Sequence, residues 1–327
     1  MVPKPLRGSE VFQLLKARME ERKAKRKKIL KRIALILAGA FILYALATTI
    51  VPVAVLSGIV NSHYSHQDSL EKNGGRFVTT SDGEQIWMKI CPAENPKGAV
   101  IFLSGMRGPA ATDYQQHADW MNGLGYTSVL MELRGHGLSS GDRIGLGFEE
   151  TEDVRAVIAE LRKDPALSDV PVILFGVSMG GATVLNALGE IPEIAGAVAL
   201  SPYASFEDNF ELRMKDFFVP PLSRMYVKFL IRSYLGRTYG EETAATVNPR
   251  TEIQKANGRP VFLIASENDP KVSAENSRIL KDLYPEADLW IRESDAHLVV
   301  QGNSLKNVRK DEEYRGKIEE WLEKNIP

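Results

Sequence analysis

One serine stands in a pattern suited to nucleophilic catalysis. Residues 172–182 read VILFGVSMGGA, with glycines two positions before and two positions after Ser178. The apolar run 171–175 predicts a strand, and residues 180–188 predict a helix. A serine in such a sharp, strained strand-to-helix turn is exposed, and small residues on both sides let the turn pack closely. These flanks favour a catalytic Ser178 over an ordinary tight turn.

A serine hydroxyl needs a general base, and a histidine most often supplies it. A nucleophile in a turn of this kind is followed along the chain by its acid and then by its base. His297 comes shortly after the last predicted strand, residues 288–292, and is the only histidine late in the chain. We therefore expect His297 to be the base. The other histidines are His63, His66, His117 and His136.

The base needs an acid that orients its ring and stabilises the charged form. Asp269 follows the predicted strand 260–265, at the sheet edge where active-site loops gather. Glu207 and Asp208 follow an earlier strand and are the alternative. The sequence favours Asp269 as the third member.

An oxyanion hole requires two main-chain N–H groups. Met179 follows the nucleophile, and Met106 lies in the loop SGMRG after strand 99–103, so these two residues are the expected donors. Arg107 could contact an acidic substrate group or simply be solvated. The stretch RGHGLSSG predicts a tight buried turn in which His136 is structural.

Short apolar runs alternate with helical segments along the rest of the chain. The predicted strands are 76–80, 85–90, 99–103, 127–133, 171–175, 195–200, 260–265 and 288–292. The predicted helices are 112–124, 149–163, 180–188, 274–284 and 312–325. This alternation predicts an α/β fold with a mainly parallel eight-stranded sheet and helices on both faces.

An insertion at about residues 205–258 interrupts this alternation and predicts a short helical lid. Its apolar residues would suit an acyl chain or a membrane surface, or would pack the lid on the body. They are Phe217, Phe218, Val219, Met225, Tyr226, Phe229 and Leu230.

The N-terminal part carries the signals of a membrane segment. Residues 1–32 hold 12 Lys and Arg against three acids, whereas the rest holds 29 basic and 39 acidic residues. The uncharged run 33–51 that follows is long enough to cross a bilayer. The positive-inside rule then places the N-terminus in the cytoplasm and the main body on the opposite, extracytoplasmic side. A cleaved signal peptide, with Ala45 and Ala47 before the cut, is the competing interpretation.

These patterns predict four parts: a basic segment 1–32, a transmembrane helix 33–60, a linker 61–75 and a catalytic domain 76–327. The acidic main body does not resemble a nucleic-acid-binding surface. We find no metal-ligand pattern and no phosphate-binding glycine loop in the sequence. Cys91 is the single cysteine, so no intrachain disulfide is possible, and we expect it to be buried.

Taken in order, SGMRG, RGHGLSSG, GVSMGG, SENDPKV and DAHL resemble the motifs of α/β-hydrolases over about residues 76–326. The chain is most similar to the Bem46-like group, which is related to serine aminopeptidase-like and monoglyceride-lipase-like enzymes. The resemblance implies a Ser178–Asp269–His297 triad, hydrolysis of an ester, thioester or amide, and no cofactor. Ser104 and Ala265-Ser266 stand where the family usually has histidine and His-Gly, which affects the expected substrate preference more than activity.

The leading hypothesis is a membrane-anchored esterase or lipase that acts on a small-molecule or lipid ester through an acyl-enzyme. The alternatives are a peptidase or protein deacylase of the same fold, and a non-catalytic binding protein. The complete set of serine, acid and histidine disfavours the last. The sequence leaves substrate identity and oligomeric state open.

Overall fold

The computed structural model describes residues 8–65, 74–213 and 224–326. Its contacts separate two units, Met1–Pro52 and Val53–Pro327. The interpretation of His66, and that of the lid residues Phe217, Phe218 and Val219, lies outside the described residues.

Eight strands of the second unit form one sheet in the order β1-β2-β4-β3-β5-β6-β7-β8. Strands β1 and β2 pair antiparallel, as do β2 and β4, and every other pairing is parallel. The strands are β1 Arg76–Thr79, β2 Gln85–Cys91, β3 Gly98–Leu103, β4 Tyr126–Met131, β5 Val172–Val177, β6 Ile194–Leu200, β7 Val261–Ser266 and β8 Asp288–Arg292. The predicted mainly parallel eight-stranded sheet is confirmed.

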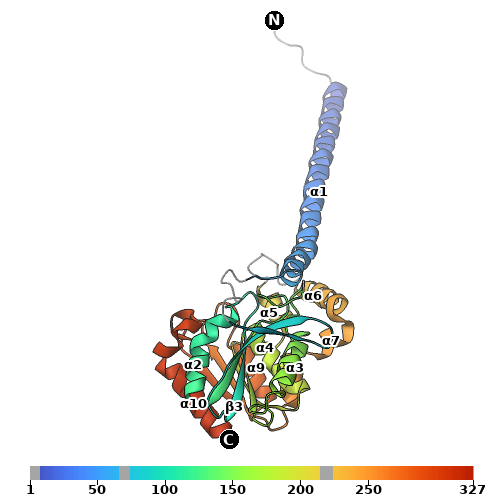
Figure 1. Cartoon of the computed structure of the whole chain (residues 1–327). Helices are drawn as coiled ribbons and strands as arrows, with labels where there is room; N and C mark the ends of the chain where they lie inside the picture. The colour runs from blue at the N-terminus through green and yellow to red at the C-terminus, as the bar shows by residue number, and fades with distance from the viewer. Residues whose placement is uncertain (1–7, 66–73, 214–223, 327) are drawn as a thin grey trace. The chain divides into compact units, whose positions relative to one another are not determined.

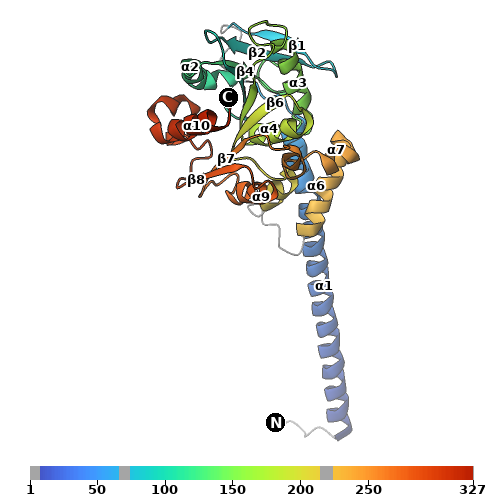
Figure 2. The ribbon, with the colours of Figure 1, turned by 90° about the horizontal axis from the view of Figure 1, so that it is seen from below.

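Helices cover both faces of this sheet, with α2 and α10 on one face and α3, α4 and α9 on the other (Figures 1 and 2). Every residue of β3, β4, β5 and β7 is buried, as expected for strands packed on both sides. Besides α1 and the lid helices, the described chain contains η2 Ala111–Tyr114, α2 Gln115–Gly123, α3 Glu150–Leu161, α4 Met179–Glu190, α9 Glu275–Leu283, η6 Gln301–Asn303, η7 Leu305–Lys310 and α10 Glu312–Asn325.

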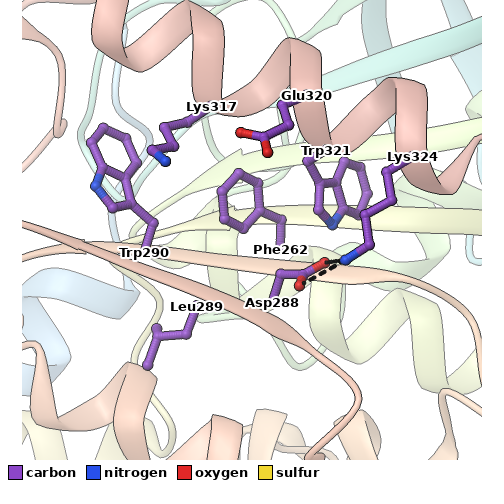
Figure 3. Close-up of a pocket in the computed structure, with 8 residues that line it drawn as sticks. All are labelled: Phe262, Asp288, Leu289, Trp290, Lys317, Glu320, Trp321 and Lys324. Carbon is purple, nitrogen blue, oxygen red and sulfur yellow. Dashed lines mark hydrogen bonds and ion pairs between the residues drawn. The ribbon is translucent and has the colours of Figure 1, made fainter.

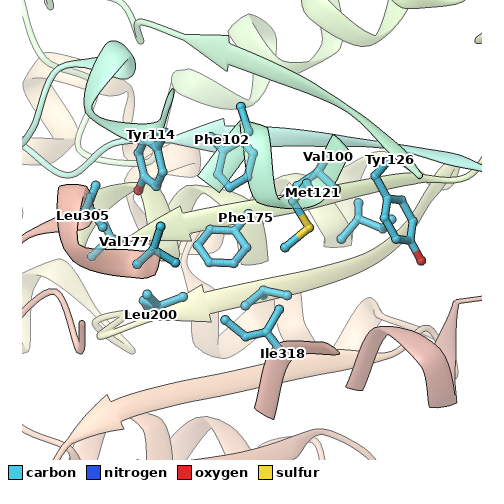
Figure 4. Packing of buried hydrophobic residues seen from close by; sticks show 14 of the residues in the cluster. Val100, Phe102, Tyr114, Met121, Tyr126, Phe175, Val177, Leu200, Leu305 and Ile318 are labelled. Carbon is cyan, nitrogen blue, oxygen red and sulfur yellow. The ribbon is translucent and has the colours of Figure 1, made fainter. Parts of the chain in front are cut away.

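The core on the α2 and α10 face is built around aromatic rings (Figure 4). The ring centroid of Phe102 on β3 lies 5.0 Å from that of Tyr114 and 5.1 Å from that of Phe175 on β5. Tyr314 and Ile318 of α10 close the cluster from outside. This packing fixes β3 and β5, the two strands whose carboxyl ends lead into the SGMRG loop and Ser178.

In its described part, the lid insertion consists of helices joined by short turns, with no strand. It contains α5 Phe206–Arg213, α6 Arg224–Tyr239, α7 Glu241–Thr246, α8 Pro249–Glu252 and η5 Ile253–Lys255. Met225 and Phe229 of α6 expose 85% and 65% of their surface, so these two apolar side chains do not pack the lid on the body.

The N-terminal helix α1 runs from Gly8 to Val60, longer than the predicted span 33–60. Within it, Phe12–Val60 is long and apolar enough to cross a membrane, a test that a signal sequence near an N-terminus also passes. The side chains of Ile36 and Phe41 are 70% and 69% exposed, which a buried core helix would not show.

The end of α1 differs from the predicted boundaries. Residues from Val53 onward belong to the second unit, and Leu56 and Val60 have no exposed surface. Tyr64, in the predicted linker 61–75, exchanges two main-chain hydrogen bonds of 2.8 Å with Gly135 and Gly137. The apolar residues after Pro52 therefore belong to the body, because there they find a core to pack against.

Candidate active site

Ser178 lies in a strained turn between β5 and α4. Its φ of 58° and ψ of −118° are sparsely populated for a residue with a side chain. The main-chain N–H of Ser178 donates to the carbonyl of Leu200 at 2.8 Å, and its carbonyl accepts from the N–H of Ala182 at 2.9 Å. These bonds hold the half-buried Ser178 in the strained conformation.

The glycines around Ser178 are there because the backbone approaches too closely for a side chain. A Cβ atom on Gly176 would lie 2.2 Å from the carbonyl oxygen of Gly180. One on Gly180 would lie 2.4 Å from the carbonyl oxygen of Leu103, where β3 ends. The glycine pattern seen in the sequence is therefore a packing requirement of the turn.

His297 and Asp269 are hydrogen-bonded, with 2.7 Å between Nδ1 and Oδ2. The other oxygen of Asp269 accepts the main-chain N–H groups of Lys271 and Val272 at 2.7 and 3.2 Å. Burial by itself would raise the pKa of Asp269, but the hydrogen bond and charge of His297 and the two N–H groups outweigh it, so the pKa lies below 3.8. An ionised Asp269 favours a proton on Nδ1 of His297, which leaves Nε2 free to act as a base.

The loop that carries His297 is fixed through its main chain. The hydroxyl of Ser201, directly after β6, donates to the carbonyl of His297 at 2.9 Å. The hydroxyl of Ser266, the last residue of β7, donates to the carbonyl of Ala296 at 2.7 Å. Two strand ends thus hold the backbone that carries His297.

Ser178 and His297 line one pocket of about 490 Å³, with Asp269 bonded behind His297. Within the described chain no hydrogen bond joins the hydroxyl of Ser178 to His297, and such bonds are often long before substrate binds. The lining residues are Gly105, Met106, Arg107, Gly108, Pro109, Val177, Ser178, Met179, Tyr203, Phe206, Asn209, Lys271, Val272, His297, Leu298 and Asn303.

Both expected oxyanion donors lie on the wall of this pocket. Met179 is the first residue of α4, so its N–H is one of the unpaired donors of the helix N-terminus. Met106 lies in a turn closed by a hydrogen bond of 2.9 Å from the N–H of Gly108 to the carbonyl of Gly105. A Cβ atom on Gly105 would lie 3.0 Å from the Cβ atom of Ser178, so the turn sits against the nucleophile.

His136 is buried and structural, as the sequence indicates. Its Nδ1 lies 3.0 Å from the carbonyl of Arg134, and its Nε2 accepts the main-chain N–H of Arg107 at 3.2 Å. The side chain of Arg107 is exposed and lines the pocket, and its guanidinium also makes contacts that neither expectation included. It donates to the carbonyl of Gly58 at 2.6 Å and to the hydroxyl of Ser62 at 3.0 Å, a contact that the sequence analysis missed.

The two acids considered as alternatives to Asp269 lie in a different cavity. Glu207 and Asp208 line a separate cavity of about 190 Å³. Asp208 pairs with Lys228 of α6 and with Arg250, the latter at 3.1 Å. Glu207 pairs with Arg232 of α6 at 3.7 Å, so both acids contact the lid helix, whereas the carboxylate bonded to His297 is that of Asp269.

The remaining described histidines have structural partners. His63 lies 3.0 Å from the carbonyls of both Gly137 and Gly141. His117 is enclosed by aromatic rings, and burial lowers its pKa to about 3. Within the described residues no group of three or more His, Cys, Asp or Glu is arranged to hold a metal ion.

Another cavity, of about 210 Å³, lies between β8 and α10 (Figure 3). It is lined by aromatic rings and by charged side chains that include the Asp288–Lys324 ion pair. No predicted site residue lines this cavity.

A family model described as serine aminopeptidase, S33, matches residues 94–279. The chain belongs to this family. It is therefore an α/β-hydrolase of the serine hydrolase class, and the resemblance inferred from its motifs is confirmed.

Relatives of this S33 family member include monoglyceride lipases. The mouse enzyme is 31% identical over 129 residues, which is 38% of this chain and 42% of the lipase. The chain thus spans less than half the length of these lipases. The uncharacterized protein YqkD of Bacillus subtilis is 24% identical over 204 residues, 61% of this chain and 63% of the relative. A solved structure of an esterase of Pyrococcus furiosus is 20% identical and shares the fold, with a TM-score of 0.60. The alignment covers 82% of this chain and 98% of the esterase chain.

Proposed function

We propose that this S33 family member is a membrane-anchored hydrolase that cleaves an ester through an acyl-enzyme. Ser178 is the nucleophile, His297 the base and Asp269 the orienting acid. The observation that carries the proposal is the strained Ser178 facing the same pocket as His297, whose Nδ1 is bonded to the buried Asp269.

The proposed reaction follows from these positions. The hydroxyl oxygen of Ser178 attacks the acyl carbon while Nε2 of His297 takes the proton. The N–H groups of Met106 and Met179 stabilise the oxyanion. Collapse of the tetrahedral intermediate expels the alcohol, which receives the proton from His297. Water, deprotonated by His297, then attacks the acyl-enzyme and releases the acid and Ser178.

A lipid or acyl ester is the proposed substrate class. The similarity to monoglyceride lipases supports it, as do Tyr203, Phe206 and Leu298 in the pocket wall. The family model supports a second candidate, a peptidase, because its description is that of a serine aminopeptidase. The two differ in the leaving group, an alcohol or an amine.

A fluorophosphonate probe tests the nucleophile, and a substrate panel tests the class. The wild-type chain should be labelled and Ser178→Ala should not. Labelling that survives this substitution would remove Ser178 from its proposed role. Acyl esters of increasing chain length should be hydrolysed faster than aminoacyl amides of matched size. The reverse order would favour the peptidase.

We also propose that α1 is retained as a single anchor, with the N-terminus in the cytoplasm and the catalytic unit across the membrane. The basic residues before Ile33 support this orientation, because such clusters resist translocation. Protease added outside sealed spheroplasts should digest the catalytic unit. Protection of that unit would reverse the orientation, and a mature protein that begins near Thr48 would identify a cleaved signal peptide.

A further inference from the structure

The turn that carries Met106 has an arginine where backbone geometry favours glycine. Residues 105–108 form a β-turn, and Arg107 occupies its third position with a φ of 50°. Turns with positive φ at that position usually have glycine or asparagine there. A larger residue costs of order 1–3 kcal/mol, which its surroundings must offset. Two contacts of Arg107 supply that support.

The first contact holds the main chain of Arg107 to the core. Its N–H donates to Nε2 of His136, and Nδ1 of the same ring faces the carbonyl of Arg134. Because the ring accepts at Nε2, its proton lies on Nδ1, where the carbonyl can receive it. Arg134 is itself anchored by a 2.7 Å ion pair to Asp153, a carboxylate with no exposed surface. The turn is thus bonded to a rigid part of the body.

The second contact joins the side chain of Arg107 to the end of α1. Its Nη2 donates to the carbonyl of Gly58 at 2.6 Å and to the hydroxyl of Ser62 at 3.0 Å. Gly58 lies in the last turn of the helix, where carbonyls lack helical partners and the helix dipole favours a cation. The N–H of Ser62 bonds the carbonyl of Val60 instead, at 2.9 Å.

The acceptors of this second contact are themselves fixed to the body. Val60 is fully buried, and its carbonyl accepts the N–H of Ile144 at 2.9 Å. Gly58 and Ser62 belong to the same unit as the pocket. The guanidinium of Arg107 therefore bonds to a fixed point.

We propose that Arg107 is a positioning residue for the oxyanion turn, and that residues 58–62 belong to the active-site scaffold. This inference rests on the proposed function, because it requires Met106 to be an oxyanion donor. Without the guanidinium, the hydrogen bond from the N–H of Arg107 to His136 is the remaining described link between Arg107 and the body, so the adjacent N–H of Met106 is held less firmly in its direction. Removing a whole oxyanion donor costs about 10²–10³ in kcat, so a misdirected one should cost about 10- to 100-fold.

The test uses the full-length protein and the substitution Arg107→Gly. Glycine accepts the positive φ without strain, so the change removes the side-chain contacts and spares the turn itself. We expect kcat for a short soluble ester to fall about 10- to 100-fold, while KM stays within about threefold. The affinity for a trifluoromethyl ketone, whose adduct with serine carries an oxyanion, should fall in parallel with kcat. Arg107→Lys, which keeps one charged donor, should recover part of both.

The matched control is Arg309→Ala, which removes another exposed guanidinium, bonded at 2.6 Å to Asp119. It should leave kcat and inhibitor affinity unchanged. Wild-type kcat and inhibitor affinity in Arg107→Gly would overturn the inference, as would a rise in KM alone. If Arg107→Gly lowers the melting temperature markedly, Ser62→Ala decides, because it removes one of the two acceptors of the guanidinium and leaves the carbonyl of Gly58 in place. A smaller loss of kcat at unchanged KM supports the inference, and no change refutes it.

Failure of the inference and failure of the proposed function give different results. A wild-type protein that hydrolyses no ester and is not labelled at Ser178 would refute the proposed function itself. A wild-type protein that is active and labelled at Ser178, together with a fully active Arg107→Gly, would refute only the role of Arg107.

Discussion

Replacing Asp269 by asparagine changes one atom of the proposed triad and keeps its shape. Oδ1 of Asp269 accepts the N–H groups of Lys271 and Val272, and Oδ2 bonds Nδ1 of His297. The amide oxygen of an asparagine can keep the first two bonds. Its amide nitrogen then faces Nδ1 of His297 and can only donate. The ring must therefore accept at Nδ1 and carry its proton on Nε2, which prevents it from taking the proton of Ser178.

The size of the effect follows from this change of tautomer. The same substitution in a serine protease triad lowers kcat about 10⁴-fold. At about 1.36 kcal/mol for each factor of ten, this is a loss of about 5.4 kcal/mol of transition-state stabilisation. The pocket, the oxyanion donors and the strained Ser178 remain, so hydrolysis should stay above the uncatalysed rate. KM should change little, because Asp269 lies behind His297 and does not line the pocket.

The assay is kcat for a short soluble ester, corrected for contaminating activity with Ser178→Ala. The matched control is Asp208→Asn, which changes the alternative acid in the same way. Asp208 holds Lys228 and Arg250 on partly exposed surfaces, where an ion pair contributes about 1 kcal/mol or less. We expect Asp208→Asn to keep kcat within about threefold. A loss under tenfold in Asp269→Asn, or a larger loss in Asp208→Asn, would refute the assignment of the acid.

Three further predictions concern the scaffold, each read from thermal unfolding of the solubilised protein. Gly180→Ala should destabilise the folded protein by about 3 kcal/mol or more, because the added Cβ atom would lie 2.4 Å from a main-chain oxygen. The control is Gly123→Ala, whose added Cβ atom would have no neighbour within 4 Å. It should be neutral or stabilise the fold by up to about 1 kcal/mol. Burial lowers the pKa of His117 from 6.5 to about 3, so between these pH values only the unfolded chain takes up this proton, and the free energy of unfolding falls by up to about 1.4 kcal/mol for each pH unit of acidification. His117→Leu should therefore make the free energy of unfolding less dependent on pH below 6.5. An unchanged pH dependence would contradict this account. Leu56→Ala should cost about 2–5 kcal/mol because Leu56 is fully buried, whereas Leu37→Ala, at a side chain 63% exposed, should leave unfolding of the body unchanged.

The sheet was predictable because its central strands are buried on both faces. The runs over β3, β5 and β7 are almost wholly apolar, and residues with helical periodicity separate them. The predicted closing helix 312–325 agrees with α10 at both ends. At its N-terminus the side chain of Asp311 accepts the N–H of Tyr314. The predicted helix 112–124 is instead a 3-10 turn followed by α2, a distinction in hydrogen bonding that the hydrophobic pattern does not carry.

The candidate site residues could be predicted because their chemical types and their order along the chain indicate the same three residues. Ser178, Asp269 and His297 each follow a predicted strand, and the carboxyl ends of parallel strands meet at one edge of the sheet. The contact between Arg107 and Gly58 has no such signal, because 49 residues separate the partners and the acceptor is a main-chain carbonyl. The boundary after Pro52 was missed for a related reason. Apolar residues that enter a membrane and those that pack on a body look alike in sequence.

Backbone strain gathers at the pocket. The described chain has eight non-glycine residues with positive φ, and three of them line the pocket: Arg107, Ser178 and Asn303. Two more lie next to the pocket. Ser201 donates a hydrogen bond to the carbonyl of His297, and Val299 follows His297 by two residues. Each costs about 1–3 kcal/mol, and strain of this kind persists only where the surroundings over-determine the backbone. Main-chain hydrogen bonds to neighbouring strands hold Ser178 and Ser201, but Arg107 depends on its side chain and on one ring nitrogen. The turn of residues 105–108 is therefore the part of the proposed site whose geometry a single side chain can change, and Arg107→Gly is the substitution that tests its proposed role in the oxyanion hole.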